Sequence, residues 1–337
     1  MIAVVTGASG FIGRHLVRRL LAEGHIVRCL VRADSGGVPP GATRHHVDYE
    51  SAASLLNCDA LDEAAVVFHL AGATRAAGAE DYTRANVTPT RHLLSALASR
   101  RLRPRLVYVS SQAAAGPAVA RDLPVREDDP PRPIDAYGRS KLEAERVVET
   151  FGDVVPFTIV RPSAVLGPGD RDFFELFRWA MRGLVIYPGT RHHWLSLLAV
   201  QDAVEGIQVA ARTERAVLRQ YFLASDSPVQ WQEVGKEVAA AAGRPVRHLN
   251  LPSVLVDVAA WGGDILSRFT GRALLANRAK ATLARAPFWV CSNERARLEL
   301  GFRPRHSLPQ MIRETYLWYS QNGWLRAPGA STRAGVA

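Results

Sequence analysis

The first residues of the chain, MIAVVTGASGFIGR (1–14), decide its fold. Residues 2–5 are uniformly apolar, which is typical of a short buried strand. Glycines follow at the spacing GxxGxxG, between this strand and the start of a helix, which is the setting that a pyrophosphate loop requires. Gly7 allows a tight turn, Gly10 lets backbone N–H groups approach a phosphate, and Gly13 permits close packing of helix on sheet. We therefore expect a dinucleotide whose phosphates lie at the helix N-terminus.

Outward from this loop, short apolar runs alternate with longer amphipathic runs as far as about residue 162. Such alternation is typical of βαβ units, in which helices cover both faces of a parallel sheet. The sequence therefore predicts an α/β fold of Rossmann type, with a doubly wound parallel sheet. The expected strands are Met1–Thr6, Ile26–Val31, His45–Asp48, Val66–Leu70, Leu106–Val109 and Phe157–Val160, and the expected helices are Phe11–Ala22, Asp81–Ser99 and Asp135–Thr150.

The pattern changes at Gly167-Pro168-Gly169, which we interpret as a hinge. We assign residues 1–165 to an NADP-binding Rossmann domain, with 196–225 returning to it. Residues 166–195 and 226–325 are assigned to a smaller, mostly helical C-terminal lobe that binds the substrate, and 326–337 to a flexible tail. The helices expected beyond the hinge are Asp172–Arg182, Val200–Ala211, Trp231–Ala242, Ser253–Phe269 and Leu308–Gln321.

Composition and charge restrict the class of protein. With 47% hydrophobic and 22% charged residues, the chain has the composition of an ordinary globular protein. Its net charge of +10 comes from arginines spread along the chain, so we expect no nucleic-acid partner. No uninterrupted run of about eighteen apolar residues is present, so no transmembrane segment is expected. The chain opens on a strand, and its 3 cysteines form no CxxC pair, which predicts a cytoplasmic protein without signal peptide or metal site.

Two arginines near the glycine loop favour NADP(H) as the cofactor. An enzyme that uses NAD usually carries Asp or Glu at the end of the second strand to bind the ribose 2′-OH, but this chain has Arg32 there. Arg14 lies in the first turn of the expected helix, where a cation opposes the helix dipole unless an anion pairs with it. We expect the two guanidinium groups to bind one 2′-phosphate. Asp34 is close enough in sequence to leave NAD(H) as an alternative.

A tyrosine and a lysine are four residues apart in Tyr137-Gly138-Arg139-Ser140-Lys141. On a helix this spacing places both side chains on the same face. A tyrosine with an ordinary pKa of about 10 is a poor base at neutral pH, but a nearby ammonium group and an oxidised nicotinamide favour its anion. Lys141 is one of only three lysines in the chain, and arginine cannot take its compact, tunable role. The pair is therefore a candidate for acid–base chemistry.

The order of the motifs resembles the extended short-chain dehydrogenase/reductase family, in the NAD-dependent epimerase/dehydratase superfamily, over essentially the whole chain. This order runs from the glycine loop through VYVSS (107–111) and the YxxxK helix to Arg161-Pro162 and Gly167-Pro168-Gly169. In appearance the chain is closest to dihydroflavonol-reductase-like and 3β-hydroxysteroid-dehydrogenase-like members. The resemblance implies a catalytic set of Ser111, Tyr137 and Lys141, in which Ser111 hydrogen-bonds the substrate oxygen and the developing alkoxide.

The same resemblance implies which residues contact the cofactor. It assigns Asp48 to the adenine amino group and Leu70-Ala71-Gly72 to the adenine ribose. Asn86 matches a family asparagine that steadies the active site, although the sequence alone describes an exposed helix residue almost equally well. The expected cofactor-binding residues are Gly7, Ser9, Gly10, Phe11, Ile12, Gly13, Arg14, Arg32, Asp48, Leu70, Ala71, Gly72, Tyr137, Lys141 and Pro162.

The expected reaction interconverts a carbonyl and a secondary alcohol. In the reductive direction, hydride transfer from the nicotinamide to the carbonyl carbon accompanies proton transfer from Tyr137 to its oxygen. The alternative is an NAD(P)-dependent nucleotide-sugar epimerase or dehydratase. Ala164 argues against it, because those relatives usually carry asparagine there. His193-Trp194 lies where they tend to carry arginine, although Arg191 is close enough to weaken this point. A cofactor-sensing regulator is a third class, but such proteins usually lack the tyrosine and lysine.

Aromatic residues in the second lobe suggest the kind of substrate. These residues are Phe173, Phe174, Phe177, Trp179 and Trp194. Aromatic residues at helical spacing more often pack inside a lobe than line a pocket. A cleft lined by them, the second possibility, would suit a largely apolar ketone or alcohol. The family resemblance also implies a homodimer that pairs the Asp81 and Tyr137 helices.

Overall fold

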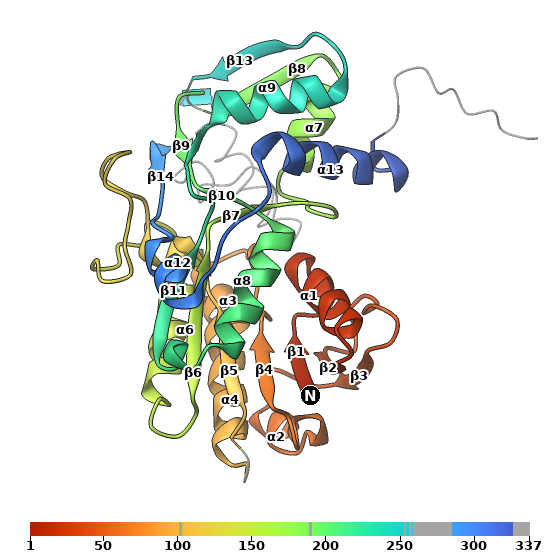
Figure 1. Cartoon of the computed structure of the whole chain (residues 1–337), viewed down its shortest axis with the longest axis vertical. Coiled ribbons are helices and arrows are strands. Elements are labelled where there is room, and N and C mark those ends of the chain that lie inside the picture. Colours follow the sequence, from red (N-terminus) through yellow and green to blue (C-terminus); the bar gives the residue numbers. More distant parts are fainter. Residues whose placement is uncertain (101–102, 189–190, 253, 256–257, 259–284, 326–337) are drawn as a thin grey trace, which may run out of the picture.

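The computed structural model describes residues 1–100, 103–188, 191–252, 254–255, 258 and 285–325 (Figure 1). Its main sheet contains strands β1 (Ile2–Thr6), β2 (Ile26–Val31), β3 (Thr43–His46), β4 (Val66–His69), β5 (Arg105–Val109), β6 (Phe157–Pro162) and β11 (Arg219–Leu223). All neighbouring pairs are parallel, in the order β11-β6-β5-β4-β1-β2-β3. The strand order reverses between β1 and β4. Such a switch point leaves a crevice for ligands at the carboxyl ends of the strands, which confirms the predicted Rossmann-type fold.

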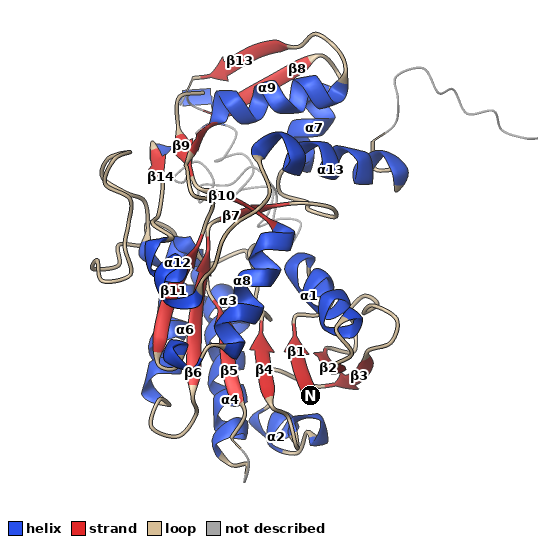
Figure 2. Ribbon diagram, viewed as in Figure 1, coloured by secondary structure: helices blue, strands red, loops and turns tan. Residues whose placement is uncertain are grey.

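Helices cover both faces of this sheet (Figure 2). On one face lie α1 (Phe11–Ala22), α8 (Val200–Arg212) and α12 (Glu294–Leu300), and on the other lie α2 (Ala52–Leu56), α4 (Thr88–Ala98) and α6 (Ala136–Thr150). Alternate residues of each strand contribute their side chains to two hydrophobic cores, one on each face of the sheet. Ala3 and Val5 pack under α1, whereas Val4 packs on the opposite face, and none of the three is exposed to solvent. The sheet is therefore buried on both sides.

The remaining elements form a smaller part at the top of Figure 1 and connect it to the sheet. They are α7 (Phe174–Ala180), α9 (Trp231–Ala242), α13 (Leu308–Gln321), β7 (Ala164–Leu166), β8 (Leu184–Pro188), β9 (Trp194–Leu195), β10 (Leu197–Ala199), β12 (Val229–Gln230), β13 (Arg247–Leu251) and β14 (Phe288–Trp289). The strands form three small sheets, so this part holds more strand than predicted. Helix α12 packs against the main sheet through Ala296 and Leu300, although it lies within the range 226–325 predicted for the second lobe.

Several predicted elements have the observed bounds, namely Phe11–Ala22, Ile26–Val31, Trp231–Ala242 and Leu308–Gln321. The strand predicted for His45–Asp48 was wrong at both ends. Strand β3 ends at His46 because Oδ1 of Asp48 accepts a hydrogen bond from the backbone of Glu50, which makes a turn. Most of Ser253–Phe269 and all of 326–337 lie outside the described residues. In the described part of the chain, no helix is long and apolar enough to cross a membrane.

The helix predicted for Asp81–Ser99 has three segments. These are α3 (Ala79–Tyr82), a π-helical turn over Thr83–Val87, and α4. A short helix, α5 (Gln112–Ala115), follows β5 directly, and two 3-10 turns cover Asp59–Leu61 and Glu214–Ala216. Helix α5 begins three residues after the end of β5, so it lies beside the crevice.

Candidate active site

The glycine loop joins β1 to α1 through very close backbone contacts. Gly7 has a φ of +69°, and a Cβ placed on it would lie 2.7 Å from the backbone nitrogen of Ala71. A Cβ on Gly13 would lie 2.2 Å from the carbonyl oxygen of Gly7, so Gly13 packs against the loop itself. Gly10 is exposed at the N-terminus of α1, whose first turn contains no acidic residue. Because the first N–H groups of a helix have no partner within it, this end suits an anion.

The predicted residues around these glycines lie together. Ser9, Phe11 and Ile12 are half-buried in the same loop and first helical turn. The segment after β4 closes over the loop, since the hydroxyl oxygen of Thr6 accepts hydrogen bonds from the N–H groups of Leu70 (3.1 Å) and Ala71 (3.0 Å). The structure thus brings the predicted phosphate segment and the predicted ribose segment into contact.

A buried hydrogen-bond chain behind this contact was not predicted. Oγ1 of Thr6 lies 2.7 Å from Nδ1 of His69, and Nε2 of His69 lies 3.0 Å from Oγ1 of Thr90. Thr90 donates its own proton to the carbonyl oxygen of Asn86, so it accepts from His69. Burial lowers the pKa of His69 to about 3, which keeps its imidazole neutral with the proton on Nε2. No sequence pattern relates residues that are 63 positions apart.

Arg14 and Arg32 border one short loop after β2. Nε of Arg32 forms an exposed ion pair with Oδ1 of Asp34 at 3.2 Å. A Cβ placed on Gly36 would lie 3.7 Å from the guanidinium group of Arg14. The two arginines therefore approach the same loop from opposite elements, and Asp34 competes for Arg32. Asp48 is exposed beyond the end of β3 and caps its own turn.

Helix α6 brings Tyr137 to the carboxyl end of β5. Asp135 caps the helix by accepting a hydrogen bond from the N–H group of Gly138 at 2.8 Å. A Cβ on Gly138 would lie 2.2 Å from the carbonyl oxygen of Ala113, so α6 packs directly on α5. Ser111 is the N-cap of α5. The two helix starts therefore hold Ser111 and Tyr137 side by side.

The three predicted catalytic residues differ in their electrostatic environment. Burial raises the pKa of Tyr137 to about 12, while a hydrogen bond with the Ser111 hydroxyl acts in the opposite direction. Burial lowers the pKa of Lys141 to about 7, and the nearby carboxylate of Glu145 opposes that change. The ammonium group of Lys141 donates to the carbonyl oxygen of Val109 at 2.8 Å. A tyrosine protonated at neutral pH thus lies one helical turn from a lysine whose charge is readily tuned.

Asn86 is buried and ties three segments of the site together. Its Oδ1 accepts from the N–H group of Ala73 at 2.7 Å, and its Nδ2 donates to Oγ of Ser140 at 2.8 Å. The interpretation of Asn86 as an exposed helix residue was therefore wrong. Tyr82, which the sequence did not single out, packs against Tyr137 with ring centroids 6.0 Å apart.

The described residues fit a dinucleotide at this end of the sheet. The glycine loop provides a cradle that side chains would fill, and two serines offer polar atoms that lack a protein partner. The hydroxyl groups of Ser110 and Ser163 are buried, at the ends of β5 and β6, and no described residue hydrogen-bonds to them. Pro162, also predicted at the cofactor, is the last residue of β6. These atoms are available to a polar ligand lying across the strand ends.

The aromatic residues of the second lobe mostly pack against one another. Phe174 contacts Tyr319 and Trp324, with ring centroids 5.1 and 5.4 Å away, and Phe177 is 1% exposed. Trp194 is covered by the guanidinium group of Arg121 at 3.9 Å. For Phe174 and Phe177 the structure agrees with packing inside the lobe, the interpretation that the sequence favoured, and not with a cleft lined by these rings. Both rings belong to the hydrophobic core of the lobe.

Comparisons with known proteins agree with this architecture. Residues 3–223 match the profile of the NAD dependent epimerase/dehydratase family. A ceramide reductase of Caulobacter vibrioides is 28% identical over 329 residues, covering 96% of each chain. A 3β-hydroxysteroid dehydrogenase/Δ5→4-isomerase of Mycobacterium tuberculosis is 28% identical over 340 residues, covering 94% of this chain and 90% of the relative.

A solved structure is similar over nearly the whole chain. MoeE5 in complex with UDP-glucuronic acid and NAD superposes with a TM-score of 0.77 at 25% identity. The match covers 96% of this chain and 100% of that chain. The similar proteins thus include both reductases and proteins that bind sugar nucleotides.

Proposed function

This chain belongs to the NAD dependent epimerase/dehydratase family, and from that premise we propose that it is an NADP(H)-dependent oxidoreductase. It interconverts a carbonyl and a secondary alcohol on a largely apolar small molecule. The observation that carries the proposal is the arrangement of Ser111, Tyr137 and Lys141 at the carboxyl end of β5, at the same edge of the sheet as the glycine loop. A regulator that only binds the cofactor has no need of a phenol and an ammonium group one helical turn apart.

Each member of this set has a distinct task in ketone reduction. NADPH, when bound, would supply hydride to the carbonyl carbon. The Ser111 hydroxyl donates a hydrogen bond to the carbonyl oxygen and stabilises the charge that develops there. Tyr137 gives its proton to the same oxygen, and the ammonium group of Lys141 stabilises the tyrosinate that remains. Alcohol oxidation uses the same groups in reverse.

The raised pKa of Tyr137 suits the reductive direction. With a pKa of about 12 in the absence of ligands, its phenol is protonated throughout the neutral range and is ready to act as an acid. To act as a base it must first lose that proton. The charges of Lys141 and of an oxidised nicotinamide favour this loss.

The preference for NADP(H) rests on Arg14 and Arg32. Both approach the loop after β2, where the ribose 2′-phosphate of NADP would lie. The proposal requires Arg32 to exchange Asp34 for this phosphate. Exposed ion pairs contribute only about 0–1 kcal/mol, so the exchange costs little.

Two relatives support an apolar substrate by their names, which refer to ceramide and to a hydroxysteroid. The alternative function, a nucleotide-sugar epimerase or dehydratase, is supported by the family and by the ligands of MoeE5. We favour the reductase because Ala164 offers no side-chain hydrogen bond to a sugar nucleotide. His193 lies where nucleotide-sugar enzymes tend to carry arginine. It is buried, and burial lowers its pKa, which favours the neutral imidazole.

Cofactor titration tests the proposal first. The purified protein is titrated with NADPH and with NADH, followed by nicotinamide fluorescence, and the titrations are repeated with Arg32→Ala. We expect NADPH to bind about tenfold tighter, and the substitution to remove about 1.4 kcal/mol of that preference. Asp34→Ala is the matched control and should retain or increase the preference. If NADH binds to the wild-type protein as tightly as NADPH or more tightly, the proposed preference for NADP(H) is overturned. UDP- and dTDP-sugars would then be the first substrates to assay.

We also propose a cytoplasmic homodimer that pairs the α3–α4 and α6 helices. The homodimer rests on the family resemblance alone, and the location rests on the three cysteines, which form no CxxC pair. Sedimentation of the purified chain at micromolar concentration tests the assembly, and a monomer would overturn it.

A further inference from the structure

A line of buried charged side chains leads inward from Lys141. Lys141, Glu145, Arg161 and Glu127 are 5%, 1%, 3% and 4% exposed. They come from α6, β6 and the loop between α5 and α6, and their charges alternate in sign. Because an unpaired buried charge is strongly unfavourable, such alternation keeps each charge compensated by its neighbours.

The first pair lies on one face of α6. Lys141 and Glu145 are four residues apart, one helical turn, and both are buried. Among the described residues, the other contacts of the Lys141 ammonium group carry no full charge. They are the carbonyl oxygen of Val109 at 2.8 Å and the ring of Tyr108, whose centroid is 4.4 Å away. Glu145 is therefore the carboxylate that acts on Lys141.

The other titratable groups around Lys141 are neutral at physiological pH. His69 on β4 has its pKa lowered to about 3 by burial, so it stays uncharged. Burial raises the pKa of Tyr108 on β5 and of Tyr137 on α6, so both phenols keep their protons. Glu149 lies two helical turns from Lys141, on the exposed side of α6. Partial burial and the nearby charge of Glu145 raise its pKa.

Arg161 fixes the position of Glu145. Its Nε donates to Oε1 at 2.9 Å and its Nη2 to Oε2 at 2.6 Å, so both carboxylate oxygens are engaged. Burial opposes the charge of Arg161, but these hydrogen bonds raise its pKa above the ordinary value. Glu145 is consequently held in one orientation behind Lys141.

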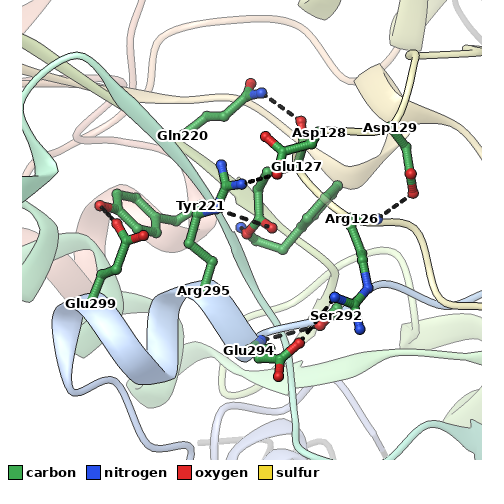
Figure 3. Close-up of polar contacts among 11 residues, drawn as sticks. Arg126, Glu127, Asp128, Asp129, Gln220, Tyr221, Ser292, Glu294, Arg295 and Glu299 are labelled. Atoms are coloured by element: carbon green, nitrogen blue, oxygen red, sulfur yellow. Dashed lines mark hydrogen bonds and ion pairs between the residues drawn. The ribbon is translucent and has the colours of Figure 1, made fainter.

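Glu127 is the last member of the line and acts on Arg161 through its charge. Figure 3 shows its surroundings. Its Oε1 accepts from the N–H group of Phe222 at 2.9 Å, and its Oε2 lies 3.8 Å from Nε of Arg295. The ring of Phe222 lies 5.5 Å from the guanidinium carbon of Arg161. The outer end of the line is thus anchored to β11 and α12.

We propose that Glu145, held by Arg161, is a positioning residue that keeps Lys141 in its ammonium form. The proposal rests on the proposed function, in which Lys141 stabilises the tyrosinate of Tyr137. Desolvation of Lys141 disfavours its charge, and the charge of the Glu145 carboxylate, one helical turn away, opposes this effect. Without it, Lys141 would release its proton at lower pH and could no longer support Tyr137 in the neutral range.

The test removes the pair as a unit, because Glu145→Gln alone would leave Arg161 buried without a partner. In Glu145→Gln/Arg161→Met both charges are absent, and such replacements are often tolerated. The chain has only three lysines, so labelling lysine with 13C at the ε carbon gives three signals. Lys236→Arg and Lys280→Arg variants identify the Lys141 signal, whose titration is followed by NMR in the full chain.

We expect the titration midpoint of Lys141 to fall by about 1 pH unit or more in the double variant. The loss of kcat/KM at rising pH should move down by a similar amount. Glu149→Gln, on the same helix, is the matched control and should move neither. A folded double variant with an unchanged Lys141 midpoint overturns the inference, since a purely structural pair would alter stability and leave the midpoint in place.

The two proposals fail in different ways. If the Lys141 midpoint falls as expected but neither enzyme reduces any ketone with NADPH, the positioning role stands and the proposed function fails. If the wild-type enzyme reduces ketones but the midpoint does not move, the proposed function stands and the inference fails.

Discussion

Single residues of the site are tuned mainly by burial. Burial raises the pKa of Tyr137 and lowers that of Lys141, so it opposes the charged form of each, and the Glu145 carboxylate counteracts this effect at Lys141. Neither shift depends on an unusual backbone conformation. The positions of the two residues follow from the cap at Asp135 and the contact between Gly138 and Ala113. The reactive groups are therefore set by the packing of α6 on α5.

Tyr137→Phe tests the role of the phenol. The ring would keep its packing against Tyr82, but the proton donor would be absent. We expect kcat for ketone reduction to fall about 10²- to 10⁴-fold, with the dissociation constant of NADPH nearly unchanged. Steady-state kinetics and a cofactor titration measure both quantities. Tyr82→Phe is the control, because its hydroxyl donates to the carbonyl oxygen of Thr74 at 3.3 Å; a loss as large as that of Tyr137→Phe would count against the assignment.

How much of the site the sequence could predict depends on sequence separation. The relation between Tyr137 and Lys141 is local, because helical geometry alone places residues four apart on one face. The relation between Thr6 and His69 crosses 63 positions, and that between Glu145 and Arg161 crosses 16. Both depend on which strands become neighbours. Spacing could not reveal them, although Glu145 one turn beyond Lys141 was a visible signal.

Among the elements, the π-helical turn over Thr83–Val87 positions Asn86. A π turn inserts an extra residue into a helix and is frequent at functional sites. Here it lies between α3 and α4 and directs Asn86 toward Ala73 and Ser140. The wider turn thus joins the loop after β4 to α6.

Asn86→Ala tests this link between the loop after β4 and α6. The substitution removes the hydrogen bonds to Ala73 and Ser140 and leaves buried partners unsatisfied. We expect the free energy of unfolding to fall by about 2 to 4 kcal/mol and kcat/KM to fall at least about tenfold. Urea denaturation and steady-state kinetics provide the two values. Arg84→Ala, an exposed residue of the same turn, should change stability by less than about 0.5 kcal/mol; equal effects would refute the role of Asn86.

Element prediction succeeded where the apolar pattern was long. Helices α1, α9 and α13 have at least 12 residues each, and their predicted bounds match. The short strands β9, β12 and β14 have two residues each and carry no periodic signal. The predicted helix Asp81–Ser99 differs from the observed segments, Ala79–Ala98, by two residues at its start and one at its end, and its π turn was not predicted. Local pattern therefore gives the sheet and its helices, and misses the small sheets beyond it.

At the scale of the whole molecule, a few contacts connect the cofactor end to the second part. Nε2 of His15 on α1 lies 2.8 Å from the carbonyl oxygen of Pro168, and Arg75 forms an ion pair with Asp172. The hydroxyl of Tyr319 on α13 donates to the carbonyl oxygen of Asp170 at 2.7 Å. The segment after β7, interpreted as a hinge from its glycines, is therefore held on both sides.

Asp170 lies in this segment after β7, and its carboxyl group should make the free energy of unfolding depend on pH. Its carboxyl accepts from the N–H groups of Asp172 (3.0 Å) and Phe173 (2.7 Å), yet burial raises its pKa from 3.8 to about 6. Between these values the folded chain holds a proton that the unfolded chain releases. Its contribution to stability is therefore complete below about pH 4 and is lost as the pH rises through about 6.

Asp170→Asn removes this titration and some of the hydrogen bonding. We expect the stability of wild type relative to the variant to decline from pH 4.5 to pH 7, by at most about 3 kcal/mol. Urea denaturation at several pH values measures the difference, so that the acid sensitivity shared by both proteins cancels. Glu175→Gln on α7 is the matched control and should differ from wild type by a constant amount. If the difference in stability between wild type and Asp170→Asn is also constant with pH, the prediction is wrong. Asp170 would then be ionised in the folded chain across this range, held as a carboxylate by the N–H groups of Asp172 and Phe173.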